Sequence, residues 1–346
     1  MTTGNENDKD NGSSVQGVLI TRHPLNPDVY HVFCTDDAIS TVNEGLDYFT
    51  LDKSGVVLSG PTTIQTGWSY EGLSATLHSN GIDVWVMSQE FDNGNYNAYL
   101  IDCNGLNLAK SNLGQDMGID FRGEKSYTRG ALEFSWDGTK LAQGHPAAWP
   151  VGMQEVSLFD FNNSDGSLSG TIHFSSVLTT DEVYDIEFSN DNSKLYFTTK
   201  HAIVGVYDLS SGNAATITAS MDTVGILTTY WGGSEAGIET AADGNIYINS
   251  IRESDLHVIS GSSLNPVSVG SDLEITLGLP NNYLPPQDWV KIQDPGTLTD
   301  CDLPLDLETK WLCKDISAEN TSGYENAYSL DSSCTGCSID PVTGVF

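Results

Sequence analysis

Residues that share a face of a strand recur at every second position along most of the chain. Tyr196 and Thr198 show this spacing, and so do Tyr247 and Asn249. Alternation at two is typical of β-strands, whereas a helical solenoid would place apolar residues three and four apart over about ten or more positions. Turns rich in Gly, Asn and Asp separate the segments. The pattern therefore predicts an all-β chain with many short strands.

The strands recur as a repeat with one order of elements. Five segments open with VQGVLITRHPLNPDVYHVFCT, EGLSATLHSNGIDVWVMSQ, RGALEFSWDGTKLAQGH, VYDIEFSNDNSKLYFTTK and AGIETAADGNIYINSI. The turn residue before the second strand marks each repeat, at Asn26, Asn80, Asp137, Asp191 and Asp243. Successive marks lie 54, 57, 54 and 52 residues apart. A period of this length is typical of one propeller blade.

Two further strands complete each repeat, so the predicted fold is a β-propeller of four-stranded antiparallel blades. In the fourth repeat, for example, we expect the outer strands at IVGVYDL and ATITAS. A β-sandwich also has many short strands, but it does not require a register that is kept over five repeats. We expect residues 1–14 to be a disordered leader, 15–285 the propeller, and 286–346 a Cys-containing tail or an irregular closing blade. Whether the ring has five blades or a sixth one from this tail stays open.

An ordered run of motifs between residues 15 and 285 resembles a known family. The motifs are HSNGIDVWVMSQEFDNGNYNAYLIDCNGL, FSWDGTKLA, VSLFDFNNSDGSLSG, YDIEFSNDNSKLYFTT, ADGNIYI and LGLPNNY. They are similar to the propeller near the start of large secreted proteins of gliding Bacteroidetes, which often end in a gliding-motility-type or type IX secretion sorting domain. The resemblance implies an extracellular or cell-surface module, and it implies no enzyme chemistry.

Composition excludes two classes of partner. The 346 residues include 14 Lys and Arg against 47 Asp and Glu, which gives a net charge of −33. Binding to nucleic acid or to an anionic membrane requires clustered basic residues, so both are disfavoured. No apolar run of about 18 residues is present to insert into a membrane. We expect a surface glycan or a protein partner instead, including assembly into an oligomer or larger structure.

The leading ends of the innermost propeller strands form one mouth of the central channel, where many propellers bind ligands. Polar and aromatic residues expected near these ends form the candidate ligand site: Arg22, His23, His78, Arg129, Tyr184, Asp185 and Glu235. The structural alternative is that these residues pair with one another. Arg129, for example, would then neutralise Asp185 or Glu235.

The segment DFNNSDGSL is the candidate metal site. Asp160, Asn162, Ser164 and Asp165 offer oxygen ligands at a spacing comparable to that of a Ca²⁺ loop. A bidentate carboxylate is missing where an EF-hand would have it, near Ile172. The alternative is an ordinary turn, in which Asp or Asn side chains accept backbone hydrogen bonds.

Four of the six cysteines crowd into the last part of the chain. Cys301, Cys313, Cys334 and Cys337 lie outside the repeat, and we expect them to form two disulfides, with a zinc site as the alternative. Pairing of Cys301 with Cys313 and of Cys334 with Cys337 is the simplest of the three connectivities. The remaining two cysteines, Cys34 and Cys103, are expected to be buried thiols.

Three functions remain open at this stage. The first is a secreted or surface-displayed propeller that serves as a binding or scaffold module for a glycan, a peptide or a partner subunit. The second is a propeller-type hydrolase, lactonase-like or glycan-cleaving, that uses the channel mouth. No Gly-x-Ser-x-Gly elbow, His-Glu-x-x-His helix or glycine-rich phosphate loop supports it. The third is a structural subunit of an extracellular filament or virion.

Overall fold

The structure is a computed structural model of the chain. It describes the following residues: 16–35, 45–67, 70–90, 94–113, 130–145, 156–174, 183–199, 201, 203–227, 236–241, 244–250, 256–260 and 263–267. The chain divides into two units, Met1–Lys291 and Ile292–Phe346, and every described residue belongs to the first.

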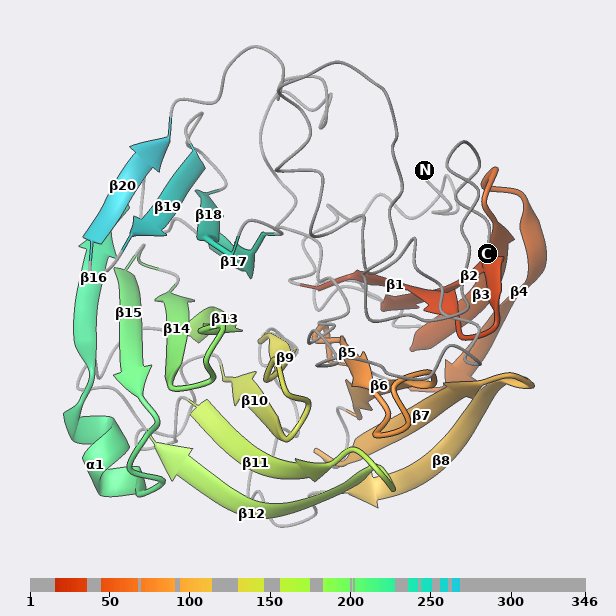
Figure 1. Ribbon diagram of the computed structural model, residues 1–346, viewed down its shortest axis with the longest axis horizontal. Coiled ribbons are helices and arrows are strands. Elements are labelled where there is room, and N and C mark those ends of the chain that lie inside the picture. The colour runs from red at the N-terminus through yellow and green to blue at the C-terminus, as the bar shows by residue number, and fades with distance from the viewer. Residues whose placement is uncertain are drawn as a thin grey trace, which may run out of the picture. The chain divides into compact units, whose positions relative to one another are not determined.

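Twenty strands and one helix make up the described part (Figure 1). Blade 1 contains β1 (Val18–His23), β2 (Asn26–Thr35), β3 (Leu46–Asp52) and β4 (Val57–Gln65). Blade 2 contains β5 (Ser74–Leu77), β6 (Val84–Gln89), β7 (Tyr96–Asp102) and β8 (Gly105–Leu113). Blade 3 contains β9 (Leu132–Phe134), β10 (Lys140–Gly144), β11 (Val156–Asn162) and β12 (Ser167–Phe174).

The last two blades follow the same order. Blade 4 contains β13 (Val183–Phe188), β14 (Lys194–Thr199), β15 (Ile203–Asp208), the helix α1 (Ala214–Ala219) and β16 (Asp222–Ile226). Blade 5 contains β17 (Ala236–Thr240), β18 (Ile246–Ser250), β19 (Leu256–Ser260) and β20 (Ser263–Val267). No helix among the described residues is long and apolar enough to cross a membrane.

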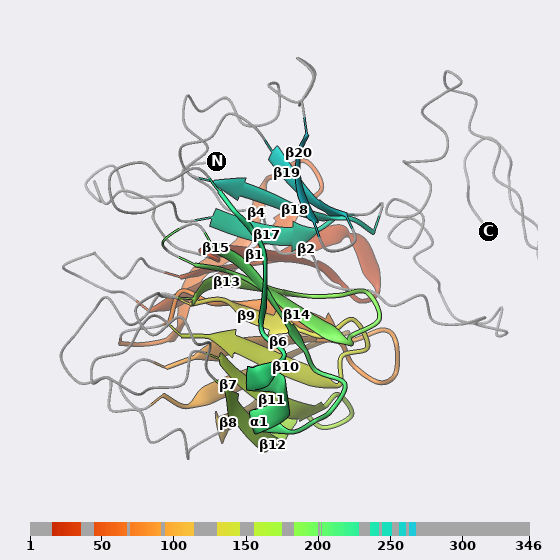
Figure 2. The same ribbon diagram turned by 90° about the vertical axis from the view of Figure 1, so that its left-hand side faces the viewer.

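Each blade is one antiparallel sheet whose strands follow one another in chain order. The first strand of each blade is the innermost one, and the five sheets stand around a common centre (Figure 1). Seen from the side, the third, fourth and fifth sheets lie one above another (Figure 2). The described part is therefore a five-bladed β-propeller, which confirms the fold that the repeat predicts. A sixth blade from the tail would lie outside the described residues.

Apolar clusters between adjacent blades hold the propeller together. Trp85 packs with Phe134 and Phe161 of blade 3, and its ring meets that of Phe161 edge to face at a centroid distance of 6.1 Å. Tyr196 packs against Ile238 of blade 5 in the same way. Burial of such side chains between β-sheets is the main stabilising contribution to a fold of this kind. Both aromatic residues therefore lie between neighbouring blades.

One predicted strand is wrong. The segment ATITAS falls within α1 and the residue after it, whereas the outer strand of blade 4 is β16, which follows the helix. Asn213 is the reason, because its Oδ1 accepts hydrogen bonds from the backbone N–H groups of Ala215 and Thr216 and so caps the helix. Ile217 is buried and joins the cluster between blades 3 and 4. The alternating Thr and Ile side chains of this segment resemble a strand, but the cap decides the local structure.

The two ends of the propeller carry different kinds of connection. We call the end at which the inner strands β1, β5, β9, β13 and β17 begin the leading end, and the opposite one the trailing end. At the trailing end the strands are joined by two to six residues, apart from the connection that contains α1. The leading end has connections of three to eighteen residues, and the longest are 114–131 and 145–155.

We expect Tyr196→Ala to lower the free energy of unfolding by about 3 kcal/mol or more, because it leaves a cavity between blades 4 and 5. Tyr247, at the same register in blade 5, is only half-buried, so Tyr247→Ala is the matched control and should cost less. Urea unfolding of the two variants measures the difference. Equal losses of unfolding free energy in the two variants would show that packing of Tyr196 between blades 4 and 5 does not contribute to stability.

Candidate functional site

The structure separates the residues predicted to line one channel mouth. Tyr184 and Asp185 lie at the start of β13, at the leading end. Arg22 and His23 are instead the last two residues of β1, and His78 directly follows the last residue of β5. These three lie at the trailing end, so the prediction that they line the same mouth is wrong. The reason is the short length of the inner strands. Each turn mark comes just after the end of an inner strand, so residues close to the mark lie at the trailing end and not at the start of the strand.

Arg129 and Glu235 of the same set lie outside the described residues. By sequence they come shortly before β9 and directly before β17, respectively. Their place in the chain is thus next to the leading ends of two inner strands. Pairing of Arg129 with either acidic residue stays a prediction.

Asp185 has a structural task at the inner edge of the propeller. Its Oδ2 accepts a hydrogen bond of 2.8 Å from the backbone N–H of Ile238 in blade 5, and its Oδ1 accepts one from Ile186. Gln16 acts similarly, since its Oε1 accepts from the backbone N–H groups of Leu73 and Leu132 at 3.1 and 2.8 Å. The inner edge of a blade has no neighbouring strand, so these side chains satisfy backbone groups that burial would otherwise leave without a partner.

His78 belongs to a contact between blades 2 and 3. Its Nε2 lies 3.2 Å from the carbonyl oxygen of Ser164, and the Trp85 indole N–H donates to the carbonyl of Asn163 at 2.8 Å. Gly166 fits against this indole, because a Cβ at that position would lie 2.7 Å from the ring, and its φ of +76° also favours glycine. The turn that contains the candidate calcium ligands is therefore a docking element for the preceding blade.

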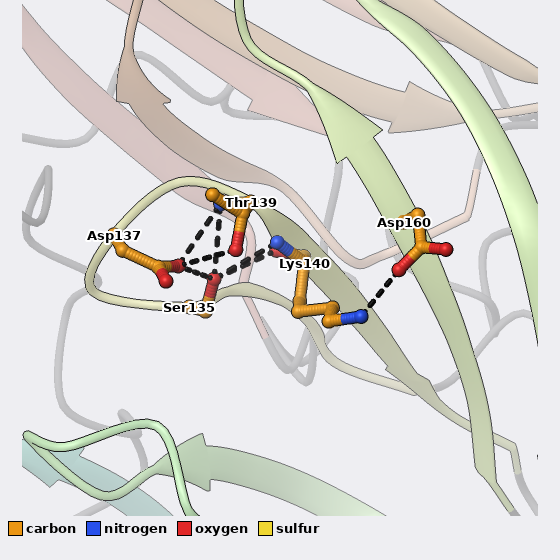
Figure 3. A network of polar contacts seen from close by, with 5 residues as sticks. All are labelled: Ser135, Asp137, Thr139, Lys140 and Asp160. Atoms are coloured by element: carbon orange, nitrogen blue, oxygen red, sulfur yellow. Dashed lines mark hydrogen bonds and ion pairs between the residues drawn. The ribbon is translucent and has the colours of Figure 1, made fainter. Parts of the chain in front are cut away.

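The four candidate calcium ligands use their oxygens within the fold. Asn162 Oδ1 accepts from the backbone N–H and the hydroxyl of Ser164. Asp165 Oδ1 accepts in the same way from Ser167, and the hydroxyl contact is the first cause of a lowered pKa of Asp165. Asp160 forms an ion pair with Lys140 of the neighbouring strand (Figure 3). Calcium binding in this turn stays a prediction, and among the described residues no group of three or more His, Cys, Asp or Glu is placed to hold a metal ion.

The hairpin turns of the trailing end share this chemistry. In blade 3, Asp137 Oδ1 accepts from the Ser135 hydroxyl and from both the N–H and the hydroxyl of Thr139 (Figure 3). In blade 4, Asp191 makes the equivalent bonds with Ser189 and Ser193, which lower the pKa of Asp191 to about 2. The side chains of these turns are thus engaged in local structure.

A buried polar layer lies between blades 1, 2 and 3 at the leading end. Ser88 and Asn97 both donate to Gln65 Oε1, at 2.8 and 3.0 Å, and Gln65 Nε2 donates to the carbonyl of Gln89. Gln143 of blade 3 donates to the Gln89 side chain in turn. All five residues are buried. Amides that bridge three blades in this way fix the relative positions of the blades where the long connections begin.

Three glutamates occupy the same register position in consecutive blades. Glu133, Glu187 and Glu239 lie on β9, β13 and β17, and all three are buried. Thr240 donates to Glu187 Oε1 at 2.9 Å, across the boundary between blades 4 and 5. Sequence reasoning missed this set, although a signal is present: each glutamate stands four residues before its turn mark, in LEF, IEF and IET.

Blade 3 also holds a chain of two imidazoles and a hydroxyl, in which His145 and Ser157 are buried and His173 is half-buried. His145 Nε2 lies 2.8 Å from Ser157 Oγ, which in turn lies 2.9 Å from His173 Nδ1. Burial, and to a smaller extent the neighbouring His173, lower the pKa of His145 to about 3. His31, buried in blade 1 beside Tyr48, has its pKa lowered to about 4 for the same reason. Both side chains are therefore neutral at physiological pH.

The two described cysteines are free thiols. Cys34 is partly buried, and burial together with Asp47 raises its pKa to about 11. Cys103 is exposed in the turn between β7 and β8, so the prediction that it is buried is wrong. The reason is its place in a two-residue hairpin turn, where no sheet covers the side chain. The predicted disulfides of Cys301, Cys313, Cys334 and Cys337 lie outside the described residues.

Comparisons with known proteins find no family and a distant structural likeness. No known family profile matches the chain, and no curated protein does. Among solved structures, a candidate 6-phosphogluconolactonase from Bacteroides uniformis is 14% identical with a TM-score of 0.43, over 70% of this chain and 67% of that one. The β-propeller domain of Myceliophteria thermophila Cps50 (Swd1) is 12% identical with a TM-score of 0.42, over 73% and 68%. Likeness at this level says nothing about activity.

We expect Ca²⁺ and Na⁺ at equal ionic strength to raise the melting temperature equally. Both screen the repulsion among the carboxylates, while the oxygens of Asn162 and Asp165 are already engaged. Thermal unfolding in matched CaCl₂ and NaCl series measures this. A rise in melting temperature that is specific to Ca²⁺ and absent in Asp165→Asn would support a calcium site in this turn.

We expect His145 to make the protein less stable as the pH falls below about 6.5. In that range the unfolded chain binds a proton on this imidazole, while the folded protein does not until the pH approaches about 3. Stability is thus complete above pH 6.5 and lost toward pH 3, by up to about 1.4 kcal/mol per pH unit for one proton. The free energy of unfolding in urea between pH 7.5 and 4.5 should therefore depend less on pH in His145→Gln.

The control for this series is Asn107→Gln, which changes an exposed side chain on β8 that carries no titratable group. It should leave the pH dependence parallel to that of the parent protein. If His145→Gln also runs parallel to the parent, protonation of His145 does not contribute to acid unfolding.

Proposed function

We propose that this propeller is a secreted or cell-surface binding module that recognises a glycan or a protein partner with its leading end. The observation that carries the proposal is the difference between the two ends of the propeller. Trailing-end turns are short, and turn side chains such as Asp137, Asp165 and Asp191 are bonded to their own backbone. The carboxylates of these turns are thus engaged in local structure.

The leading end has the opposite properties. Its connections include the longest in the propeller, at 114–131 and 145–155, and binding residues in proteins concentrate on long loops that rise from a rigid scaffold. The scaffold beneath them is the polar layer of Gln65, Gln89 and Gln143, which ties three blades together. A rigid base lowers the entropy that the loops lose on binding.

Charge narrows the class of ligand. A chain with a net charge of −33 repels polyanions, so a neutral or basic ligand is favoured over an acidic one. Neutral polysaccharides and basic protein surfaces both satisfy this condition. The extracellular location rests on the resemblance to the propellers of secreted Bacteroidetes proteins.

A hydrolase is the second candidate, and the matched glutamates favour it. Cleavage of a glycoside requires two carboxylates, one of them kept protonated by its surroundings. Glu133, Glu187 and Glu239 are buried carboxyl groups on three neighbouring inner strands, β9, β13 and β17. Glu187 accepts a hydrogen bond from the Thr240 hydroxyl, and this contact fits a structural role in joining blades 4 and 5 equally well.

A binding screen against neutral surface polysaccharides and basic proteins tests the proposal. We expect Arg129→Ala, next to the leading end of β9, to weaken binding about tenfold, which corresponds to about 1.4 kcal/mol. The matched control is Lys53→Ala, which removes one positive charge from an exposed pair with Asp28 at the trailing end and should leave the affinity unchanged. Equal losses in both variants would contradict the assignment to the leading end.

The same samples separate the two candidate functions. Binding without release of sugar or ring-opened product supports the binding module. Release of product that is lost in Glu133→Gln would contradict the binding module and support the hydrolase.

A further inference from the structure

The side chain of Gln16 reaches from blade 1 to the inner edges of blades 2 and 3. The next residue is fixed in blade 1, because the carbonyl oxygen of Gly17 accepts a hydrogen bond of 3.0 Å from the N–H of Thr35 in β2. The carboxamide of Gln16 contacts Leu73, directly before β5, and Leu132, the first residue of β9. Gln16 is only 6% exposed, so this carboxamide lies out of water.

Three main-chain groups bind the carboxamide. Gln16 Oε1 accepts from the N–H of Leu132 at 2.8 Å and from the N–H of Leu73 at 3.1 Å. Gln16 Nε2 donates to the carbonyl oxygen of Leu132 at 2.9 Å. Leu132 thus gives both its N–H and its C=O to one side-chain amide, as a strand residue gives them to a neighbouring strand. Because β9 is the end strand of its sheet, the carboxamide takes the place that a neighbouring strand would have.

Comparison of the blades explains why blade 3 needs this contact. In blade 5, Ile238 stands at the position of Leu132, five residues before the turn mark, and its N–H donates to Asp185 of the preceding blade. The residue of blade 2 that corresponds to Asp185 is Ser74, since both stand six residues before their turn marks. Ser74 accepts from the N–H of Phe134 instead. The N–H of Leu132 is therefore left for another acceptor, which Gln16 supplies.

Main chain also forms the wall of the site. A Cβ at Gly72 would lie 2.6 Å from the carbonyl oxygen of Gly130 and 3.2 Å from Gln16 Oε1. Glycine at position 72 therefore allows the backbones of blades 2 and 3 to approach each other and the carboxamide closely. Leu73 and Leu132 are fully buried, so the groups that bind the carboxamide are shielded from water, where hydrogen bonds are stronger than at the surface.

We propose that the inner edge of blades 2 and 3 is a binding site for a primary carboxamide, which Gln16 occupies as an internal ligand. The three contacts define the class of ligand. A primary carboxamide carries one N–H hydrogen on the same side as its oxygen, so it pairs with both groups of Leu132. A trans secondary amide, such as a peptide bond or an acetamido sugar, points its N–H away from its oxygen.

A carboxylate is excluded by the same contacts. It accepts from both N–H groups, but it has no hydrogen to donate to the carbonyl oxygen of Leu132. The site therefore selects the side chain of Asn or Gln, whether this chain or a partner protein provides it. The proposal does not depend on the ligand of the leading end.

Chemical rescue of Gln16→Ala tests the site. The substitution removes the carboxamide and the carbon next to it, and acetamide consists of the same heavy atoms. We expect Gln16→Ala to melt several degrees below the parent protein. Acetamide should restore most of this loss in a concentration-dependent way, because a ligand that binds only the folded state stabilises it. Acetate and N-methylacetamide at the same concentrations should not restore it.

The matched control is Tyr196→Ala, whose cavity between blades 4 and 5 has apolar neighbours. Acetamide should leave the melting temperatures of this variant and of the parent unchanged. An equal rise in either of them would be a general solvent effect and would contradict the site. Equal rescue by acetate would contradict the donation to Leu132, and no rescue by acetamide would overturn the proposal.

Two further measurements apply if Gln16→Ala does not fold by itself. Its yield of folded protein on refolding from urea should be higher in acetamide than in acetate. Gln16→Met fills a similar space without an amide, so it should melt below the parent and gain nothing from acetamide. A Gln16→Met protein as stable as the parent would contradict the proposal. All these readouts measure stability, so they are independent of the binding screen.

Discussion

The structure depends on one constraint: a blade is a thin sheet with two apolar faces, and both must be buried by neighbours. Four clusters between successive blades meet this requirement, with Trp85 and Tyr196 as large side chains at two of the boundaries. One repeat cannot bury its apolar faces alone, so each blade gains stability from contact with the next one.

A large part of the fold is local in origin, and this is why the sequence predicts it. The turn residues Asp137 and Asp191 accept hydrogen bonds from residues two positions away, so their spacing marks each hairpin without knowledge of the rest of the molecule. The wrong prediction of a strand at α1 also has a local cause. Asn213 caps a helix with local hydrogen bonds, and strand-like alternation in the next six residues concealed it.

The candidate site was harder to predict because its contacts join distant positions. Asp185 accepts from a residue 53 positions further along, and Gln143 meets Gln89 across 54 positions. No pattern within one repeat reveals such pairs. The wrong placement of Arg22, His23 and His78 has a local cause. These residues lie close to the turn marks, and an inner strand ends only a few residues before its mark, so they lie at the end of the strand and not at its start.

Burial of polar groups distinguishes the two ends of the propeller in energetic terms. At the trailing end, polar side chains stabilise turns next to water, where their burial costs little. At the leading end, Gln65, Gln89, Gln143 and the glutamates of the inner strands are removed from water, and each such group destabilises the fold unless hydrogen bonds compensate it. Apolar side chains would pack there without this cost. Amides retained in that position are explained if the leading end must keep a fixed geometry where the long connections begin. The buried polar layer would then support the binding surface that we propose.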